Sequence, residues 1–317
     1  ILLYTQAESF AVFVVDASLL AFAEQGASAV RMTLIANLVP TEERVVVRAY
    51  LRSVTNLGFA IGTALASIAL ASDRPGSYHA LLAVGSAFFL CGAGAMTRVP
   101  AFAPAPGAAS VSRWAALTDR RYVTVVMLNS VLQLHYAVLE VGIPLWVSEH
   151  TDAPRALVSV LFLLNTVLIL FLQLPAGRRF GLLRHAGTCL TLAGVLLAAA
   201  CLLLGLSGTL TGGLTVLVLV LAGSLHALGE ILHATGSWSA GFELAPNDAQ
   251  GQYQGLFATG VGAGQTMGPL LVTALILPNE TLGWILIAAI LATAGFLMAI
   301  ATRRASVRIP GSPSLVK

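Results

Sequence analysis

Long apolar runs alternate with short polar segments along most of the chain. Runs such as 157–174 and 282–300 carry no recurring polar face, so helices on the surface of a soluble protein do not explain them. A helix of about 20 residues is about 30 Å long, which matches the hydrocarbon core of a bilayer. The pattern predicts an all-α membrane protein with nine spans, at residues 9–38, 46–71, 77–97, 121–148, 155–175, 185–206, 213–242, 249–277 and 282–302.

Composition agrees with this pattern. Hydrophobic residues make up 57% of the 317 residues, charged residues only 10%, and the mean hydropathy is +0.86. Soluble domains carry about 25% charged residues. The chain is therefore expected to lie in a lipid bilayer as an integral membrane protein.

Basic residues predict the orientation of the spans. Fourteen of the 17 fall on alternate loops, adjoining helix ends and the tail of one side, which is therefore expected to be cytoplasmic. Of the other three, Arg74 and Arg155 are expected on the opposite side and Arg31 within a span. The net charge of +3 thus reflects topology and gives no indication of nucleic-acid binding.

Two parts of the chain match each other at a constant offset of 206 residues. Each contains an apolar helix with one acid, a polar turn, a glycine-spaced helix and a further apolar helix ending in arginine. Same-direction repeats of helices in a membrane chain are typical of secondary transporters. The matched residues include Glu24 with Glu230, Pro40 with Pro246, Gly58 with Gly264, Gly62 with Gly268, and Arg98 with Arg304.

Several segments resemble the major facilitator superfamily: the turn 37–44, the glycine-rich helix 56–62, the Pro- and Ala-rich stretch 99–118, and 264–269. The resemblance implies a helical bundle with two pseudo-symmetric halves, in which the nine spans are helices four to twelve. The chain begins at Ile1 inside an apolar run, and we interpret it as N-terminally truncated. The expected division is a remnant of the N-terminal bundle (1–98), a cytoplasmic linker (99–118) with a short surface helix at 112–117, a C-terminal six-helix bundle (119–304) and a cytoplasmic tail (305–317).

Glycines at helical spacing form small-residue faces on two helices. Gly58 and Gly62, and likewise Gly264 and Gly268, are expected to permit close packing between helices. Gly264, Gly268 and Pro269 also resemble the family's antiporter motif, although in the eleventh helix rather than in the usual fifth. The segment 175–181 resembles the family's cytoplasmic gating loop without its aspartate.

Four acids lie within the spans: Asp16, Glu24, Glu140 and Glu230. A carboxylate in hydrocarbon costs several kcal/mol, so such groups face water, a partner or a substrate. The resemblance places these acids on the fourth, seventh and tenth helices, which line the family's central cavity.

Glu24 and Glu230 are the strongest candidates for proton exchange, because the repeat gives them equivalent depths. The alternative for Glu24 is a structural ion pair with Arg31, two turns along the same face.

His226, Glu230 and His233 share one helix face. A proton relay, a metal site and histidines hydrogen-bonded between helices all fit this spacing, and the metal site fits least well. No cofactor or metal is expected. Hydrogen bonds between helices are a better interpretation than a substrate path for the uncharged side chains Asn129, Gln133, Asn165, Gln173 and Gln265. Trp146 lies near a span end and fits an interfacial anchor, whereas Tyr136 and Trp238 fit stacking on a substrate.

We conclude from the sequence that the chain is a secondary active transporter of small molecules, with protons, in the plasma (inner) membrane. Four acids against one arginine favour efflux of amphipathic or cationic compounds by alternating access. The alternative transporter is a metabolite uptake carrier in which Arg31 holds an anionic group. A non-transporting sensor or scaffold on the same fold is a further alternative, whereas no nucleophile–base pair or phosphate loop indicates an enzyme.

Overall fold

The computed structural model describes residues 9–72, 74–99 and 112–306, and every regular element in these ranges is helical. The expected linker region 100–111 and tail region 307–317 lie outside the described residues. The helices are α1 (Phe10–Leu38), α2 (Arg44–Ser72), α3 (Pro75–Met96), α4 (Ala115–Thr118), α5 (Arg120–Leu132), α6 (Leu134–Ala137), a π-helical turn (Val138–Gly142), α7 (Ile143–His150), α8 (Ala156–Phe180), α9 (Leu183–Ser207), α10 (Gly213–Glu243) and α11 (Gln250–Ser306).

Each of the nine expected ranges contains a helix, and the all-α membrane fold is confirmed. Seven helical stretches in the described part of the chain are long and apolar enough to cross a membrane. The longest, α11, has 57 residues and consists of two helices joined at Glu280, whose φ of 43° and ψ of −116° interrupt the helical geometry. The stretch 120–150 is a single candidate span that contains α5, α6, the π-helical turn and α7.

The sequence repeat reappears in the helix boundaries. Helix α2 begins at Arg44 and α11 at Gln250, 206 residues later. The interruption at Glu280 lies 206 residues after Arg74, the residue that precedes α3. The three helices α1–α3 therefore correspond to α10 and the two parts of α11.

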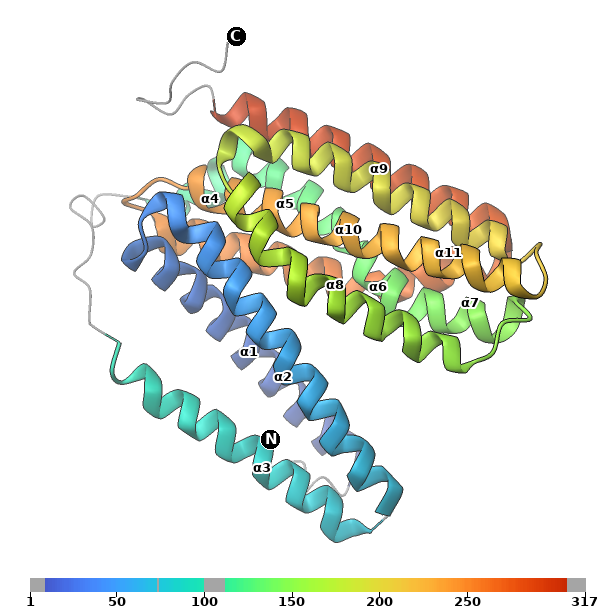
Figure 1. The fold of residues 1–317 in the computed structure, drawn as a ribbon. Helices are drawn as coiled ribbons and strands as arrows, with labels where there is room; N and C mark the ends of the chain where they lie inside the picture. The colour runs from blue at the N-terminus through green and yellow to red at the C-terminus, as the bar shows by residue number, and fades with distance from the viewer. Residues whose placement is uncertain (1–8, 73, 100–111, 307–317) are drawn as a thin grey trace.

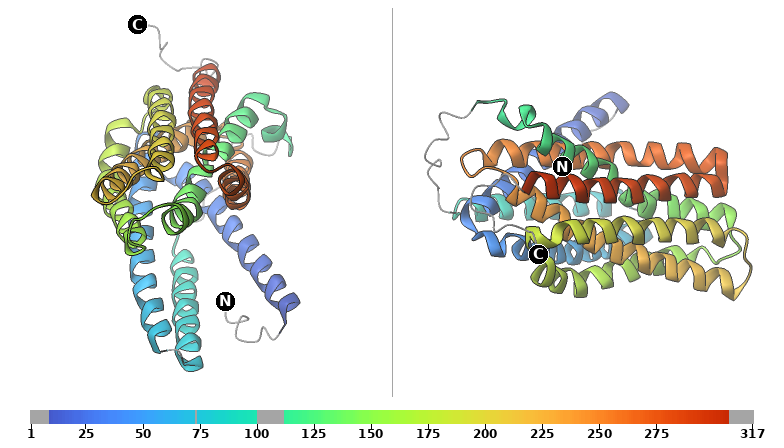
Figure 2. Two further views of the ribbon diagram at one scale, coloured as in Figure 1. Left: turned by 90° about the vertical axis from the view of Figure 1, so that its right-hand side faces the viewer. Right: turned by 90° about the horizontal axis from the view of Figure 1, so that it is seen from above.

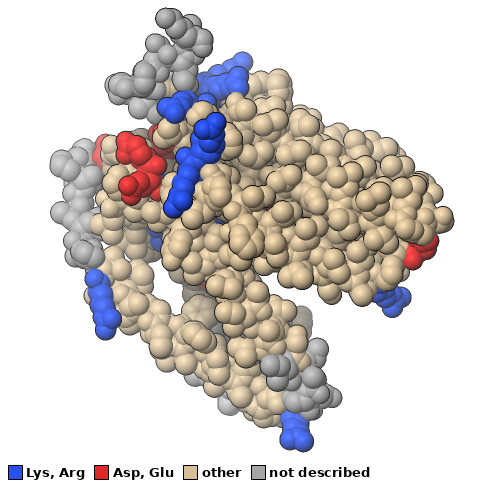
Figure 3. Space-filling view, in the orientation of Figure 1, with Lys and Arg blue, Asp and Glu red and all other residues tan. Residues whose placement is uncertain are grey.

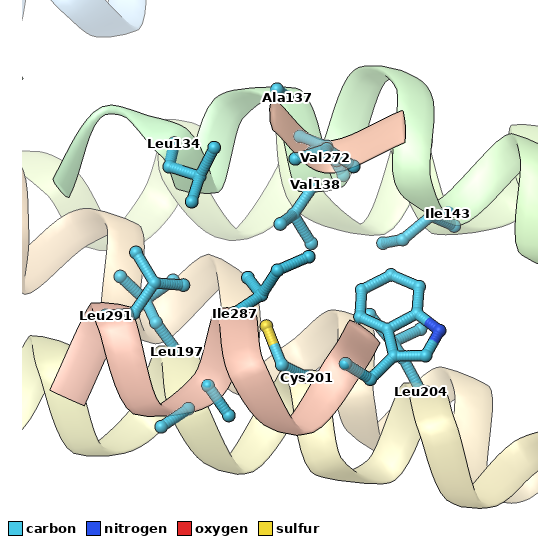
Figure 4. Close-up of a cluster of buried hydrophobic side chains, with 14 of the residues drawn as sticks. Leu134, Ala137, Val138, Ile143, Leu197, Cys201, Leu204, Val272, Ile287 and Leu291 are labelled. Carbon is cyan, nitrogen blue, oxygen red and sulfur yellow. The ribbon is translucent and has the colours of Figure 1, made fainter. Parts of the chain in front are cut away.

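Helices α5–α11 pack into one bundle around an apolar core (Figures 1 and 4). Trp146 and Trp284 are fully buried in it, with ring centroids 5.7 Å apart, and the Trp146 indole donates to Ser207 Oγ at 3.1 Å. The interpretation of Trp146 as an interfacial anchor is therefore wrong. Its position near a span end suggested the interface, but the ring points into the bundle.

The two expected small-residue faces behave differently. A Cβ on Gly264 would overlap the carbonyl oxygen of Ser130, and a Cβ on Gly268 would lie 2.9 Å from the Cβ of Ala137. This part of α11 therefore packs directly on α5 and α6. A Cβ added to Gly58 or Gly62 would meet no atom within 4 Å. Close packing is thus present at Gly264 and Gly268, with Pro269 next in the same helix, but the expectation fails for Gly58 and Gly62, which face open space.

Helix α2 makes its close contact elsewhere, on α8. A Cβ on Gly177 would lie 3.0 Å from that of Ala49, and a Cβ on Gly181 would lie 3.0 Å from that of Val45. Residues 175–180 belong to α8 rather than to a loop, so the expectation of a loop there is wrong. Pro175 does not end the helix, and the extra turns bring both glycines against α2.

Helices α1 and α2 meet the bundle at one end and diverge from it toward the other, and α3 packs on α2 away from the bundle (Figures 1 and 2). The contact end contains the turn between α1 and α2 and the turn between α8 and α9, which are on the arginine-rich side of the chain. A hollow separates the two groups of helices beyond the contact, and charged side chains gather mainly near the ends of the molecule (Figure 3).

The short segment before α5 contains a surface helix, as expected. Helix α4 covers Ala115–Thr118, with Trp114 exposed and Ala116 buried. Asp119 then caps α5 by accepting hydrogen bonds from the backbone N–H groups of Arg121 and Tyr122.

Candidate functional site

A buried carboxylate lies in the middle of α10. Glu230 is 1% exposed, and His226 and His233 on the same helix face are equally buried. A charge at this depth requires a partner, because removal of a carboxylate from water costs several kcal/mol. The shared face that the spacing predicts is therefore present and points into the protein.

Glu230 is held by side chains from two other helices. Arg52 of α2 forms a short ion pair with Oε1, and Asn165 of α8 donates to Oε2 at 2.9 Å. Nδ1 of His226 lies 3.9 Å from Oε2. Arg52 also donates to the hydroxyl of Tyr136 on α6 at 2.6 Å. The Arg52–Glu230 pair therefore links the α1–α3 group to the α5–α11 bundle.

Three histidines form a hydrogen-bonded chain beside Glu230. Nε2 of His226 donates to the backbone carbonyl of His135 at 2.9 Å, which leaves His226 Nδ1 as a free lone pair facing Glu230. Nε2 of His233 lies 3.1 Å from Asn129 Oδ1, and Nδ1 of His233 lies 3.1 Å from Nε2 of His135. These distances fit neutral histidines, each protonated on Nε2.

Two arginines of α2 flank one indole ring of α10. The Cζ atoms of Arg48 and Arg52 lie 5.4 Å and 6.0 Å from the Trp238 centroid, within range of cation–π attraction. Trp238 is 6% exposed. Its ring is therefore covered by the protein and orients the arginines rather than offering a free face for stacking.

The family model of the Major Facilitator Superfamily matches residues 1–269. The chain belongs to the Major Facilitator Superfamily. This family membership identifies a membrane transporter and not an enzyme. No curated protein matches the chain significantly.

The facilitator fold is also found in a solved structure that resembles this chain. The crystal structure of a bacterial homologue of the iron transporter ferroportin, in an outward-facing state, matches with a TM-score of 0.62. The match covers 89% of this chain and 70% of that one at 16% sequence identity. At this identity the likeness shows the fold alone.

Other predicted site residues of this facilitator lie outside the buried cluster, although the charge of Arg31 acts on Arg48 and that of Glu230 acts on Glu140. Glu24 and Arg31 on α1 are both exposed, and no ion pair joins them within the described ranges. Glu140 is exposed in the π-helical turn, and Asp16 is partly buried on α1. The repeat therefore gives Glu24 and Glu230 equivalent sequence positions but different surroundings, and the alternative of a Glu24–Arg31 ion pair is not found among the described residues.

The preference for bonds between helices is confirmed for three uncharged polar residues. Asn165 contacts Glu230, Asn129 contacts His233, and Gln173 donates to Thr235 Oγ1 at 3.3 Å. Gln265 is exposed and Gln133 is buried. Three of these side chains thus join helices, whereas the buried atoms Asn129 Nδ2, Gln133 Oε1 and Gln173 Oε1 have no hydrogen-bond partner.

A metal site finds no support in this geometry. The ring nitrogens of the three histidines contact one another, Asn129 and a backbone carbonyl. No group of three or more His, Cys, Asp or Glu side chains suited to a metal ion occurs among the residues that the structure describes.

Sequence reasoning missed Arg48 and Arg52 as site residues, because both were counted with the cytoplasmic helix ends. The sequence did contain a signal, the spacing of the arginines in α2. They recur every four residues on one helix face, at Arg44, Arg48 and Arg52, so Arg52 lies two turns inside an apolar helix. An arginine at that depth indicates an acidic partner on a neighbouring helix.

Proposed function

We propose that this facilitator is a proton-coupled carrier in which Glu230 binds and releases the coupling proton during alternating access. The observation that carries the proposal is the ion pair between Glu230 on α10 and Arg52 on α2. It is buried, it lies midway along α10, and it connects the two groups of helices that must move against each other in a rocking mechanism.

Protonation of Glu230 would change the energy of this contact directly. An ionised Glu230 attracts Arg52 and holds α2 against α10, whereas a protonated Glu230 offers only a neutral hydrogen bond. Charge-assisted hydrogen bonds are about twice as strong as neutral ones. Proton binding is therefore linked to separation of the helix groups, and by reciprocity the separation favours proton binding.

The neighbouring histidines supply a second proton acceptor. The lone pair of His226 Nδ1 faces Glu230 across 3.9 Å, a gap that one water molecule or a small rotation closes. His135 and His233 continue the chain toward Asn129. In this proposal His226 exchanges the proton with Glu230, and the other two histidines fix the positions of the rings.

The cargo in this proposal is a small amphipathic molecule that enters the hollow between the two groups of helices. Exposed Glu24 and Glu140 support the efflux of cationic compounds. The excess of acids over arginines within the spans supports a cationic cargo less than expected, because the count of four acids against one arginine left out Arg48 and Arg52. We place the carrier in the plasma (inner) membrane with its arginine-rich side in the cytoplasm.

The test uses the purified protein in proteoliposomes with a trapped pH-sensitive dye. Gradients of cationic and anionic amphipathic compounds are imposed in either direction, and wild type is compared with Glu230→Gln. Substrate-dependent proton movement is expected in wild type and not in the variant. Glu149→Gln, an exposed acid at the end of α7, is the matched control and should behave as wild type.

Three results would contradict the proposal. Substrate movement without proton flux in wild type would indicate a uniporter or another coupling ion. Unchanged proton coupling in Glu230→Gln would assign Glu230 a structural role, and the absence of any transport would favour a sensor or scaffold.

A further inference from the structure

Three guanidinium groups gather where α1 and α2 approach α10. Arg48 and Arg52 lie four residues apart on one face of α2, and Arg31 of α1 is close enough for its charge to act on Arg48. Among the described residues, Glu230 is the one carboxylate that pairs with any of the three, and it pairs with Arg52. The cluster therefore carries a positive charge that the protein does not neutralise.

Arg48 is the least satisfied member of the cluster. Its Nε is buried and has no hydrogen-bond partner, and the structure gives it no ion pair. A buried donor without a partner destabilises the protein, and more so when it is charged. A bound anion would satisfy such a group.

Trp238 holds this guanidinium in place. Its ring lies 5.4 Å from the Cζ of Arg48, so the planar group is oriented before any ligand arrives. Arg31 is exposed on α1 and offers its charge from the open side. The arrangement has an oriented, partly buried arginine and an exposed one, which suits a carboxylate or phosphate.

We propose that Arg31 and Arg48 bind the anionic group of an amphipathic substrate, with Trp238 as a positioning residue. This inference rests on the proton coupling of the proposed function, and it favours the alternative cargo, an anionic compound that moves together with the proton, over a cationic one. Arg52 joins the site when Glu230 is protonated, because the proton removes its competing partner. Proton and anion therefore bind to the same state, which is the requirement for their joint transport.

The test measures binding of three naphthalene probes to the purified protein in nanodiscs of zwitterionic lipid. The probes are 2-naphthoate, its neutral amide 2-naphthamide, and the cation 2-naphthylmethylammonium. They share one apolar body, so differences in affinity report the charge. We expect wild type to bind naphthoate at least about tenfold more tightly than the amide, as for charge-assisted hydrogen bonds to two arginines.

Variants assign the effect to residues. Arg48→Gln and Arg31→Gln should each reduce the preference for naphthoate several-fold, and Glu230→Gln should increase naphthoate affinity because it frees Arg52. Arg31 is exposed, so its variant should fold even if Arg48→Gln does not. Arg74→Gln, before α3 at the far end of α2, is the matched control and should keep the wild-type preference.

A second set of nanodiscs that contains anionic phosphatidylglycerol distinguishes the source of the anion. Displacement of naphthoate by this lipid would support an anion site filled by a lipid headgroup, and unchanged affinity would support a soluble substrate. Equal affinity for all three probes, a preference for the cation, or an unchanged preference in both arginine variants would overturn the inference. Anion binding without proton movement would leave this site intact and refute the proposed coupling.

Discussion

Arg52 and Glu230 are expected to stabilise the fold as a unit, which a double-mutant cycle measures. Glu230 retains only 2% of its side-chain exposure and Arg52 retains 18%, so the pair is largely shielded from water. Removal of one partner from a buried pair costs about 3–5 kcal/mol, because the other charge stays behind without compensation. Arg52→Gln also loses the bond to Tyr136, which adds about 1 kcal/mol.

The double variant Arg52→Gln/Glu230→Gln should be much less destabilised than the sum of the single variants. Neither charge is then left alone, and Asn165 still bonds the amide that replaces Glu230. We expect a coupling free energy of at least about 2 kcal/mol, within the range for residues in one buried network. Unfolding in mixed micelles, followed by far-ultraviolet circular dichroism, provides the free energies. A coupling below about 0.5 kcal/mol, the usual limit for independent sites, would refute this account of the pair.

Two further predictions concern packing and pH. Gly264→Ala should destabilise the protein by about 1–3 kcal/mol, because the new Cβ overlaps the Ser130 carbonyl, whereas Gly58→Ala, which meets nothing within 4 Å, should be neutral or stabilising in thermal unfolding. Asp152 lies in the loop before α8, and the N–H of Gly212, at the start of α10, donates to it at 2.6 Å and lowers the pKa of that carboxyl below its usual value. A depressed folded-state pKa gives stability that is present above the unfolded pKa of about 3.9 and is lost as the pH falls through the folded pKa. The melting temperature of wild type should therefore exceed that of Asp152→Asn at neutral pH and approach it in acid; a constant difference would contradict this.

The positions of the helices were predictable because the bilayer imposes a simple rule on sequence. Each span must be apolar over about 20 residues, and the 206-residue offset identifies equivalent helices without any knowledge of contacts. The same rule drew attention to Glu230, a carboxylate in an apolar helix, and the structure shows it buried and paired with Arg52. The two parts of α11 also match two predicted spans, because the interruption at Glu280 falls in the gap expected at 278–281.

The partners of these residues were not predictable, since they depend on packing between helices far apart in sequence. Arg52 is 178 residues from Glu230, and no local pattern names that pair. The repeat even suggested a wrong symmetry, because Glu24 matches Glu230 in sequence but is exposed. Trp146 shows the same limit, since periodicity gives its depth in the span but not the direction in which its ring points.

Direct observation of helix separation on protonation of Glu230 would test the central claim. Spin labels at Glu42, before α2, and at Arg179, near the end of α8, report the distance across the contact end on a background without native cysteines; both positions are exposed. We predict that double electron–electron resonance finds a short distance in wild type at high pH and a growing population of a longer distance as the pH falls. Glu230→Gln should show the longer distance at every pH. A wild-type distribution that does not respond to pH, or a variant that matches wild type at high pH, would contradict the claim that this carboxylate couples protons to movement of the two groups of helices.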